Sequence, residues 1–137
     1  MSLDKALQSA MSSVPECVAS GYVDMETGML LGVNTLDSHP QEVLDTLAAA
    51  TADLFQGASV SQIEKIFKKI RGTEKDEMHY FQEIFVFSEN LLHVFMRVKK
   101  YPNHVVTFVC RKSANPGMVL TKARMSLDAV SAANLVG

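Results

Sequence analysis

Three apolar runs of strand length follow one another in the second half of the chain. They comprise residues 81–87, 91–96 and 104–110. Each run is rich in β-branched and aromatic residues, which favour strands. Glu89 and Asn90 separate the first two runs, as in a two-residue hairpin loop, and Pro102 ends the second because it lacks a backbone donor. The pattern predicts an antiparallel three-stranded meander over residues 80–111.

The first run indicates that both faces of the sheet are covered. Ile84, Phe85, Val86 and Phe87 are consecutive apolar residues, and successive side chains of a strand point to opposite faces. A sheet with one face in water would alternate apolar and polar residues instead. The rest of the chain must therefore supply helices for both sides of the sheet.

The remaining segments have the periodicity of helices or of a second hairpin. Apolar residues recur at helical spacing in residues 1–14, 38–71 and 114–131, and residues 17–33 form two strands around a turn at Gly28. This order, α-β-β-α(α)-β-β-β-α, predicts a single-domain α/β (α+β) sandwich. Helices flank both faces of a five-stranded antiparallel sheet in this prediction.

Local signals divide and end the predicted helices. Gly57 fits a C-cap, and Ser59 with Gln62 fits a capping box, so two helical pieces are expected within residues 38–71. The residues from Ser131 to the end are expected to fray.

Composition excludes several classes of protein. The 137 residues suffice for one buried core, and a net charge of −2 argues against a nucleic-acid partner held by general basicity. No apolar run approaches the roughly 20 residues of a membrane span, so no membrane insertion is expected. The first residues lack the pattern of a secretory signal, and two cysteines are too few for a disulfide scaffold. A cytoplasmic location is the simplest interpretation.

The histidines do not form a metal-binding pattern. They are His39, His79, His93 and His104, and they lie in four different segments. No metal ligand and no cofactor-binding residue is therefore predicted. The two-residue hairpin loop places His93 opposite Val86 on a covered sheet, where it is either a buried neutral imidazole or a ligand contact.

The remaining candidate chemistry is sparse. Cys17 begins the first strand and Cys110 ends the fifth, so neighbouring strands would bring the two sulfurs together, as a redox pair or as two small core residues. No nucleophile elbow, phosphate-binding loop, dinucleotide fingerprint or zinc-protease motif is present. No catalytic residue is predicted, and the protein is not expected to be an enzyme.

Two groups of basic residues are either surfaces that bind a partner or the ordinary solvent-exposed (wet) faces of their elements. The first consists of Lys65, Lys68, Lys69 and Arg71, which are the candidates for contact with an acidic partner. The second consists of Arg97, Lys99 and Lys100.

Three stretches resemble the roadblock family, the dynein-light-chain-like regulators of Ras-type small GTPases. Residues 20–24 followed by 27–32 look like the first hairpin of that family, and a long helix follows directly. Residues 114–120, in which an Asn and a Gly precede the helix, are similar to the opening of its C-terminal helix. The resemblance covers nearly the whole chain and contains no catalytic signature.

The resemblance implies a fold and a mode of assembly. The sheet order is expected to be 2-1-5-4-3, as in a roadblock/profilin-like fold, with one long helix on one face and the terminal helices on the other. Members form homodimers or heterodimers through the long helix and the third strand, which is a sheet edge. Residues 57–71 depart from this pattern, because a second capped helical segment could extend or cover the dimer face.

The implied edge has a physical rationale. The strand from Tyr80 to Ser88 is long and apolar, and only Glu83 and Gln82 would guard it against uncontrolled pairing. Pairing with its copy about a two-fold axis would close the assembly. The candidate dimer-interface residues are Tyr80, Phe81, Gln82, Glu83, Ile84, Phe85, Ala49, Ala52, Asp53 and Gln56.

The sequence and the resemblance together predict a non-catalytic, homodimeric binding module that regulates or scaffolds a Ras-like small GTPase. The alternative is a small-molecule sensor with a pocket between sheet and helix. A cavity inside the protomer would favour the sensor, whereas a filled interior with an exposed apolar patch would favour the binding module.

Overall fold

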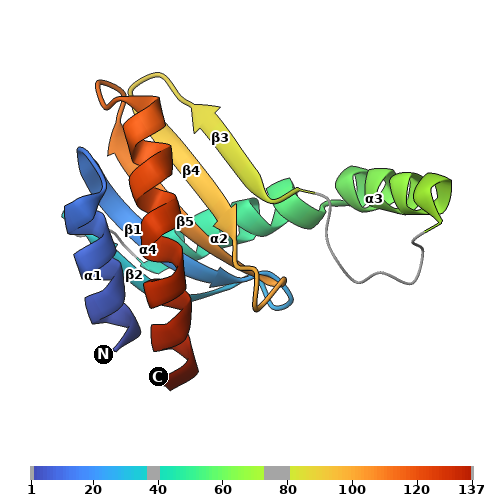
Figure 1. The fold of residues 1–137 in the computed structure, drawn as a ribbon, viewed down its shortest axis with the longest axis horizontal. Helices are drawn as coiled ribbons and strands as arrows, with labels where there is room; N and C mark the ends of the chain where they lie inside the picture. The colour runs from blue at the N-terminus through green and yellow to red at the C-terminus, as the bar shows by residue number, and fades with distance from the viewer. Residues whose placement is uncertain (1, 37–40, 73–80, 137) are drawn as a thin grey trace.

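The computed structural model describes residues 2–36, 41–72 and 81–136. Its elements are α1 (Leu3–Ser13), β1 (Cys17–Asp24), β2 (Met29–Thr35), α2 (Gln41–Gln56), α3 (Ala58–Arg71), β3 (Glu83–Phe87), β4 (Leu91–Arg97), β5 (His104–Arg111) and α4 (Pro116–Val136). Figure 1 shows a sheet with α1 and α4 on one face and α2 on the other, while α3 extends away from this body.

The five strands form one antiparallel sheet in the order β2-β1-β5-β4-β3. The predicted fold class and strand order are confirmed. β3 pairs with β4 and, among the described residues, with no other strand, so it forms an edge of the sheet. The strand predicted from Tyr80 to Ser88 is shorter in the structure, where it spans Glu83–Phe87, and Tyr80 lies outside the described residues.

The β3–β4 hairpin has the register that its loop length predicts. Phe87 pairs with Leu92, and the Ser88 N–H donates to the Leu91 carbonyl over 2.9 Å, so Glu89 and Asn90 form the two-residue loop. His93 lies opposite Val86, as predicted.

Two apolar clusters fill the two sides of the sheet. Leu7 and Val119 bring α1 and α4 against the fully buried Tyr22 and Phe108. On the other face, α2 contributes Phe55, which packs with Val23, Phe95 and Val105. Burial of this apolar surface is the main term that stabilises the fold.

The ends of two helices differ from the sequence-based expectations. α4 continues to Val136 instead of fraying after residue 131, because Ser131 and Ala133 are 5% exposed and belong to the buried side of the helix. The N-cap of α3 is Gly57, so the capping box predicted at Ser59 is wrong. Gly57 is thus the single residue between α2 and α3.

Gly57 has a different role from the predicted C-cap. Its φ of −59° is outside the left-handed region that favours glycine in a C-cap. A Cβ atom on Gly57 would lie 2.7 Å from the Asp53 carbonyl oxygen, to which the Gly57 N–H donates over 2.9 Å. The close approach of the last α2 turn therefore requires glycine here.

Candidate protein interface

The outer edge of β3 presents unbonded backbone groups. The Ser88 N–H donates to Leu91, and the Gln82 carbonyl accepts from the Arg97 N–H. In an antiparallel pair, alternate residues exchange hydrogen bonds with the neighbouring strand, and the residues between them point away. The backbone groups of Glu83, Phe85 and Phe87 consequently point outward, where no described strand pairs with them.

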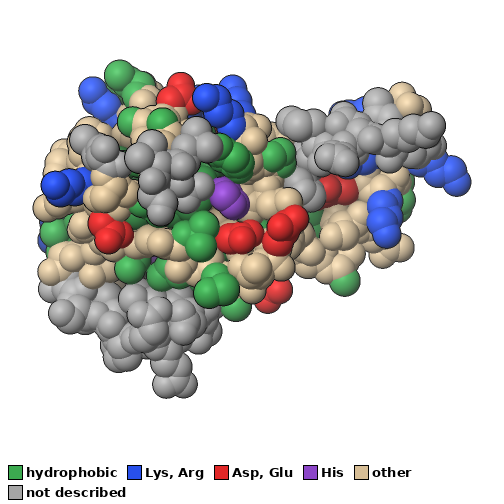
Figure 2. Space-filling view, turned by 90° about the horizontal axis from the view of Figure 1, so that it is seen from below, with side chains coloured by type: hydrophobic (Ala, Val, Ile, Leu, Met, Phe, Trp, Pro, Cys, Tyr) green, Lys and Arg blue, Asp and Glu red, His purple; other side chains and the backbone are tan. Residues whose placement is uncertain are grey.

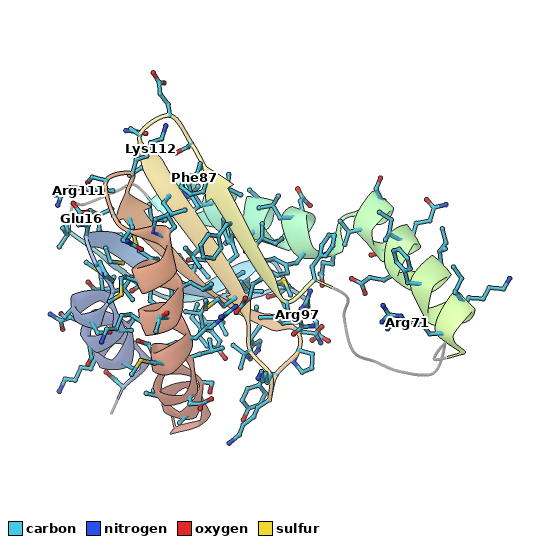
Figure 3. The ribbon with its side chains drawn as sticks, turned by 45° about the horizontal axis from the view of Figure 1, so that its top comes forward. Glu16, Arg71, Phe87, Arg97, Arg111 and Lys112 are labelled. Carbon is cyan, nitrogen blue, oxygen red and sulfur yellow. The ribbon has the colours of Figure 1, made fainter. Side chains whose placement is uncertain are left out.

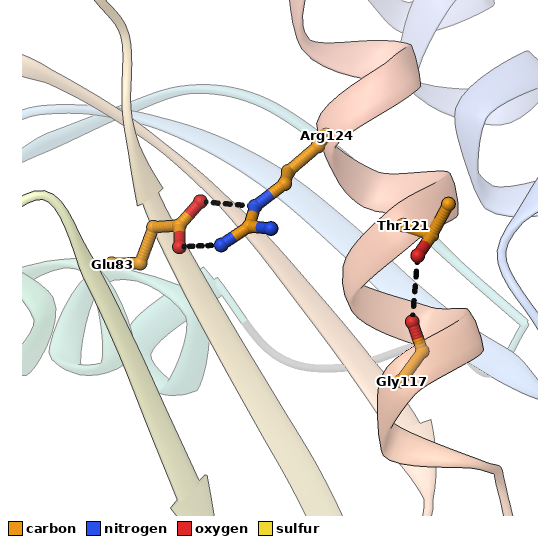
Figure 4. Close-up of polar contacts among 4 residues, drawn as sticks. All are labelled: Glu83, Gly117, Thr121 and Arg124. Carbon is orange, nitrogen blue, oxygen red and sulfur yellow. Dashed lines mark hydrogen bonds and ion pairs between the residues drawn. The ribbon is translucent and has the colours of Figure 1, made fainter.

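Glu83 does not guard this edge in the predicted way. Its carboxylate accepts two hydrogen bonds from the Arg124 guanidinium on α4, at 2.8 and 2.6 Å (Figure 4). This bidentate contact lowers the pKa of Glu83 below its usual value. About one turn earlier in α4, the Thr121 hydroxyl donates to the Gly117 carbonyl over 2.9 Å. The charge of Glu83 is held over the α4 face, and the backbone edge stays accessible.

A groove lies between α2 and the sheet. Its volume is about 350 Å³, and its wall is mostly apolar. Val18, Leu91 and Val109 line its sheet side. Leu47 and Leu54 line its helix side and remain 54% and 40% exposed. α2 covers one end of this sheet face with Phe55 and leaves apolar surface open at the other end.

Among the described residues, His93 is the titratable residue in the wall of the groove. It is half-buried, its Nε2 lies 3.3 Å from the Ser88 Oγ, and its ring stacks on Phe95 with centroids 6.4 Å apart. Burial lowers the pKa of His93, which favours the neutral imidazole. The half-buried imidazole beside the Ser88 hydroxyl fits the first interpretation from the sequence, and its place in the groove wall also fits the ligand contact.

Helix α3 carries an exposed apolar stripe, defined by Ile63, Ile66, Phe67 and Ile70. These residues have the i, i+3, i+4, i+7 spacing that places side chains on one helix face. They are between 37% and 75% exposed, whereas the buried residue of α3 is Glu64. The stripe therefore presents to solvent the kind of face that a helix usually buries.

Arg97 joins β3, β4 and the two helices near Gly57. Its Nε donates to the Phe81 carbonyl over 2.8 Å, its Nη1 donates to the Pro102 carbonyl, and its Cζ lies 5.0 Å from the Phe55 ring centroid. Burial lowers the pKa of Arg97 to about 10, opposed by the charge of Glu64. The wet-face interpretation is wrong for Arg97, which is 3% exposed and lies at the start of β3 (Figure 3).

The candidate interface residues have different surroundings. Phe81, Gln82, Ile84 and Phe85 are half-buried and Glu83 is exposed; on α2, Ala49 and Asp53 are exposed and Ala52 and Gln56 are half-buried. Gln56 Nε2 donates to the Met25 carbonyl over 2.6 Å, so this side chain holds α2 against the first hairpin. The residues of the groove wall were not among the sequence candidates, although the apolar run of β4, with Leu91 and Phe95, contributes to that wall.

The basic candidates lie on α3. Lys65, Lys69 and Arg71 are exposed and Lys68 is half-buried. Lys and Arg side chains accordingly stand out along the projecting arm in Figure 2, and Figure 3 shows Arg71 on the part of α3 far from the sheet.

The described residues contain little that resembles a catalytic or metal centre. Cys17 and Cys110 lie opposite each other on β1 and β5, both as free and buried thiols. The hydrogen bond with Cys17, and then burial, raise the pKa of Cys110. No group of three or more His, Cys, Asp or Glu side chains within the described ranges could hold a metal ion. None of the described helices is long and apolar enough to cross a bilayer.

The strand order and the helices on both faces define the Roadblock/LC7 fold. The chain superimposes with a TM-score of 0.69 on a Roadblock/LC7 domain from Streptomyces avermitilis, at 15% identity over 98% of this chain and 99% of that one. It is also similar to the gliding protein MglB from Thermus thermophilus (TM-score 0.70, 16% identity, 98% and 90% covered). A third similar structure is described as MglB with a tetrameric arrangement (TM-score 0.71, 16% identity, 96% and 86% covered). No protein-family model and no curated protein sequence matches this chain.

Proposed function

We propose that the chain is a non-catalytic, dimeric binding module that regulates or scaffolds a Ras-like small GTPase. The fold, similar to Roadblock/LC7 and MglB structures over nearly the whole chain, supports this role. The observation that carries the proposal is the exposed outer edge of β3, in a sheet that has helices packed on both faces. Such an edge favours pairing with a second strand of matching length.

The proposed dimer joins two copies of β3 about a two-fold axis at Phe85. In this register Glu83 pairs with Phe87 of the second copy, so the outward backbone groups of the two strands face one another. The pairing supplies about six backbone hydrogen bonds. It extends each sheet into one continuous sheet across the dimer.

The proposed regulation acts through positioning. A regulator of this kind stabilises one arrangement of the switch residues of the GTPase, so the GTPase supplies its own catalytic groups. Arg97 is unsuited as an arginine finger because it is buried and bonded to two carbonyl groups. The exposed α3 lysines are the proposed contact for acidic residues of the partner.

The test is affinity capture followed by binding of purified components. A tagged chain is incubated with native cell extract containing GDP or a non-hydrolysable GTP analogue, and captured proteins are identified by mass spectrometry. We expect a Ras-like GTPase whose recovery depends on the nucleotide, and whose purified form binds the chain. Absence of a GTPase under both conditions would contradict the proposal.

A second candidate function is supported by the groove between α2 and the sheet. Its volume of about 350 Å³ and its apolar wall are within the range of small-ligand sites. The chain would then be a small-molecule sensor. Native mass spectrometry of gently purified protein should show a bound apolar molecule in that case, and a mass equal to that of the bare chain would count against the sensor.

A further inference from the structure

Within the described residues, two neighbouring apolar surfaces are exposed. One is the stripe of α3, and the other is the groove beside α2. Glu64 of α3 acts electrostatically on Arg97, whose guanidinium lies over the Phe55 ring of α2. This interaction and the one-residue link to α2 bring the start of α3 close to Arg97, next to the start of β3.

The antiparallel register determines what α3 meets in the proposed dimer. The start of β3 in one copy lies against the end of β3, at Phe87, in the other copy. In that second copy, the strand next to β3 is β4, which begins at Leu91 and continues to His93. Leu91 pairs with Arg111 at the end of β5, the following strand of the sheet. The groove reaches these strand ends, since Leu91, His93 and Val109 line it. A two-fold axis normal to the sheet keeps the α2 faces of both copies on the same side.

The length of α3 matches the distance to be spanned. Figure 1 shows α3 extending past the start of β3, outside the sheet of its own chain. Its 14 residues correspond to about 21 Å at the rise of an α-helix. Three strand spacings, from β3 of one copy to β5 of the other, correspond to about 14 Å. The helix is therefore long enough to reach from its own β3 to the far wall of the groove in the second copy.

The interface also needs more area than β3 can supply. β3 has five residues, and a stable protein interface buries about 1,200–2,000 Å². Strand pairing of this length provides backbone hydrogen bonds and little apolar area. A helix that lays an i, i+3, i+4, i+7 stripe in an apolar groove is a common way to add such area.

We propose that the groove of each protomer is occupied by α3 of the second copy, so that the dimer is built by reciprocal exchange of this helix. This inference rests on the proposed β3 dimer. In it, Ile63 lies nearest to Val86 of the second copy, Ile66 and Phe67 lie near its His93, and Ile70 lies nearest to its Val109. The Lys and Arg side chains of α3 remain outside the groove.

The first experiment maps the position of α3 by photo-crosslinking. Ile66 is replaced by benzoylphenylalanine in a chain of natural isotopic composition, which is mixed with a heavy-isotope chain and irradiated. We expect light–heavy cross-links to peptides that contain residues 91–93 or 109. Cross-links confined to one chain would mean that α3 folds over its own groove, and would overturn the proposal.

The second experiment measures dimer dissociation by sedimentation. Ile66→Asp makes the charge of the stripe more negative by one unit, and the matched control Lys65→Gln makes the same change of charge at an exposed position on the opposite side of the helix. Because each dimer carries two copies of the substitution, Ile66→Asp should raise the dissociation constant at least about 100-fold. Lys65→Gln should leave it within about threefold. Circular dichroism verifies that both variants fold.

The outcomes separate the two proposals. A wild-type chain that is monomeric at tens of micromolar would overturn the β3 dimer and the helix exchange together. A dimer that keeps its affinity in Ile66→Asp and forms no light–heavy cross-link to the groove would overturn the exchange alone. A groove found filled by a small molecule would likewise overturn the exchange and favour the sensor.

Discussion

Replacement of Phe87 by proline tests the proposed use of the β3 edge. The Phe87 N–H points away from β4, so proline removes a donor that the protomer does not use. The side chain is 55% exposed, and an edge strand accepts proline where the N–H faces outward. The matched control is Phe87→Val, which removes the same ring and keeps the donor.

The magnitude follows from the two-fold symmetry. Each proline removes the bond from Phe87 to the Glu83 carbonyl of the second copy, so each dimer loses two hydrogen bonds. At about 0.5–1.5 kcal/mol net for each bond, the loss is about 1–3 kcal/mol. The dissociation constant of Phe87→Pro should therefore exceed that of Phe87→Val by about 5- to 150-fold.

The assay combines sedimentation equilibrium with urea unfolding of the dilute protomer. The protomer stabilities of the two variants should agree within about 0.5 kcal/mol, because no bond of the β3–β4 ladder is lost. Val86→Pro is the positive control for damage, since the Val86 N–H points toward β4. Equal dissociation constants for Phe87→Pro and Phe87→Val would refute the pairing of β3 edges.

Three further predictions concern the structure around α2 and the groove. Gly57→Ala should lower the free energy of unfolding by about 1–2 kcal/mol, because the added Cβ would lie 2.7 Å from the Asp53 carbonyl oxygen. Urea titration measures this change, and an unchanged free energy of unfolding would contradict the close approach. Arg97→Met should cost about 2–4 kcal/mol by the same titration, because charge-assisted bonds to two carbonyl groups and the contact with Phe55 are lost. The lowered pKa of His93 means that only the unfolded chain takes up this proton just below pH 6.5, so stability should fall as the pH decreases from about 7 to about 5. His93→Gln should reduce that slope, and a slope equal to that of the wild type would refute the assignment.

The sheet could be predicted from the sequence because its signals are local. The run from Ile84 to Phe87 indicated a sheet with helices on both faces, which the structure has, although Val86 and Phe87 themselves are 36% and 55% exposed at the edge. The two-residue loop Glu89-Asn90 places His93 opposite Val86 before any tertiary contact is known. The strand order came from the resemblance to the roadblock family, since pattern and loop length do not determine which strands are neighbours.

The surroundings of α3 could not be predicted in the same way. Gly57 looks like a C-cap because glycine is common there, whereas the structure requires glycine for a close contact with a carbonyl group. Arg97 looks like a surface residue in the sequence, and its partners Phe81 and Pro102 come together only in the folded sheet. The groove depends on how far α2 covers the sheet, which is a tertiary property.

The one-residue junction at Gly57 makes α3 a lever attached to α2. With a helix of about 21 Å, a rotation of about 10° at the junction displaces the far end by nearly 4 Å. Motion that is barely detectable near Phe55 would thus be amplified to the scale of a side chain at Arg71. A ligand or a protein that tilts α2 slightly would therefore displace the far end of α3, without any rearrangement of the strands.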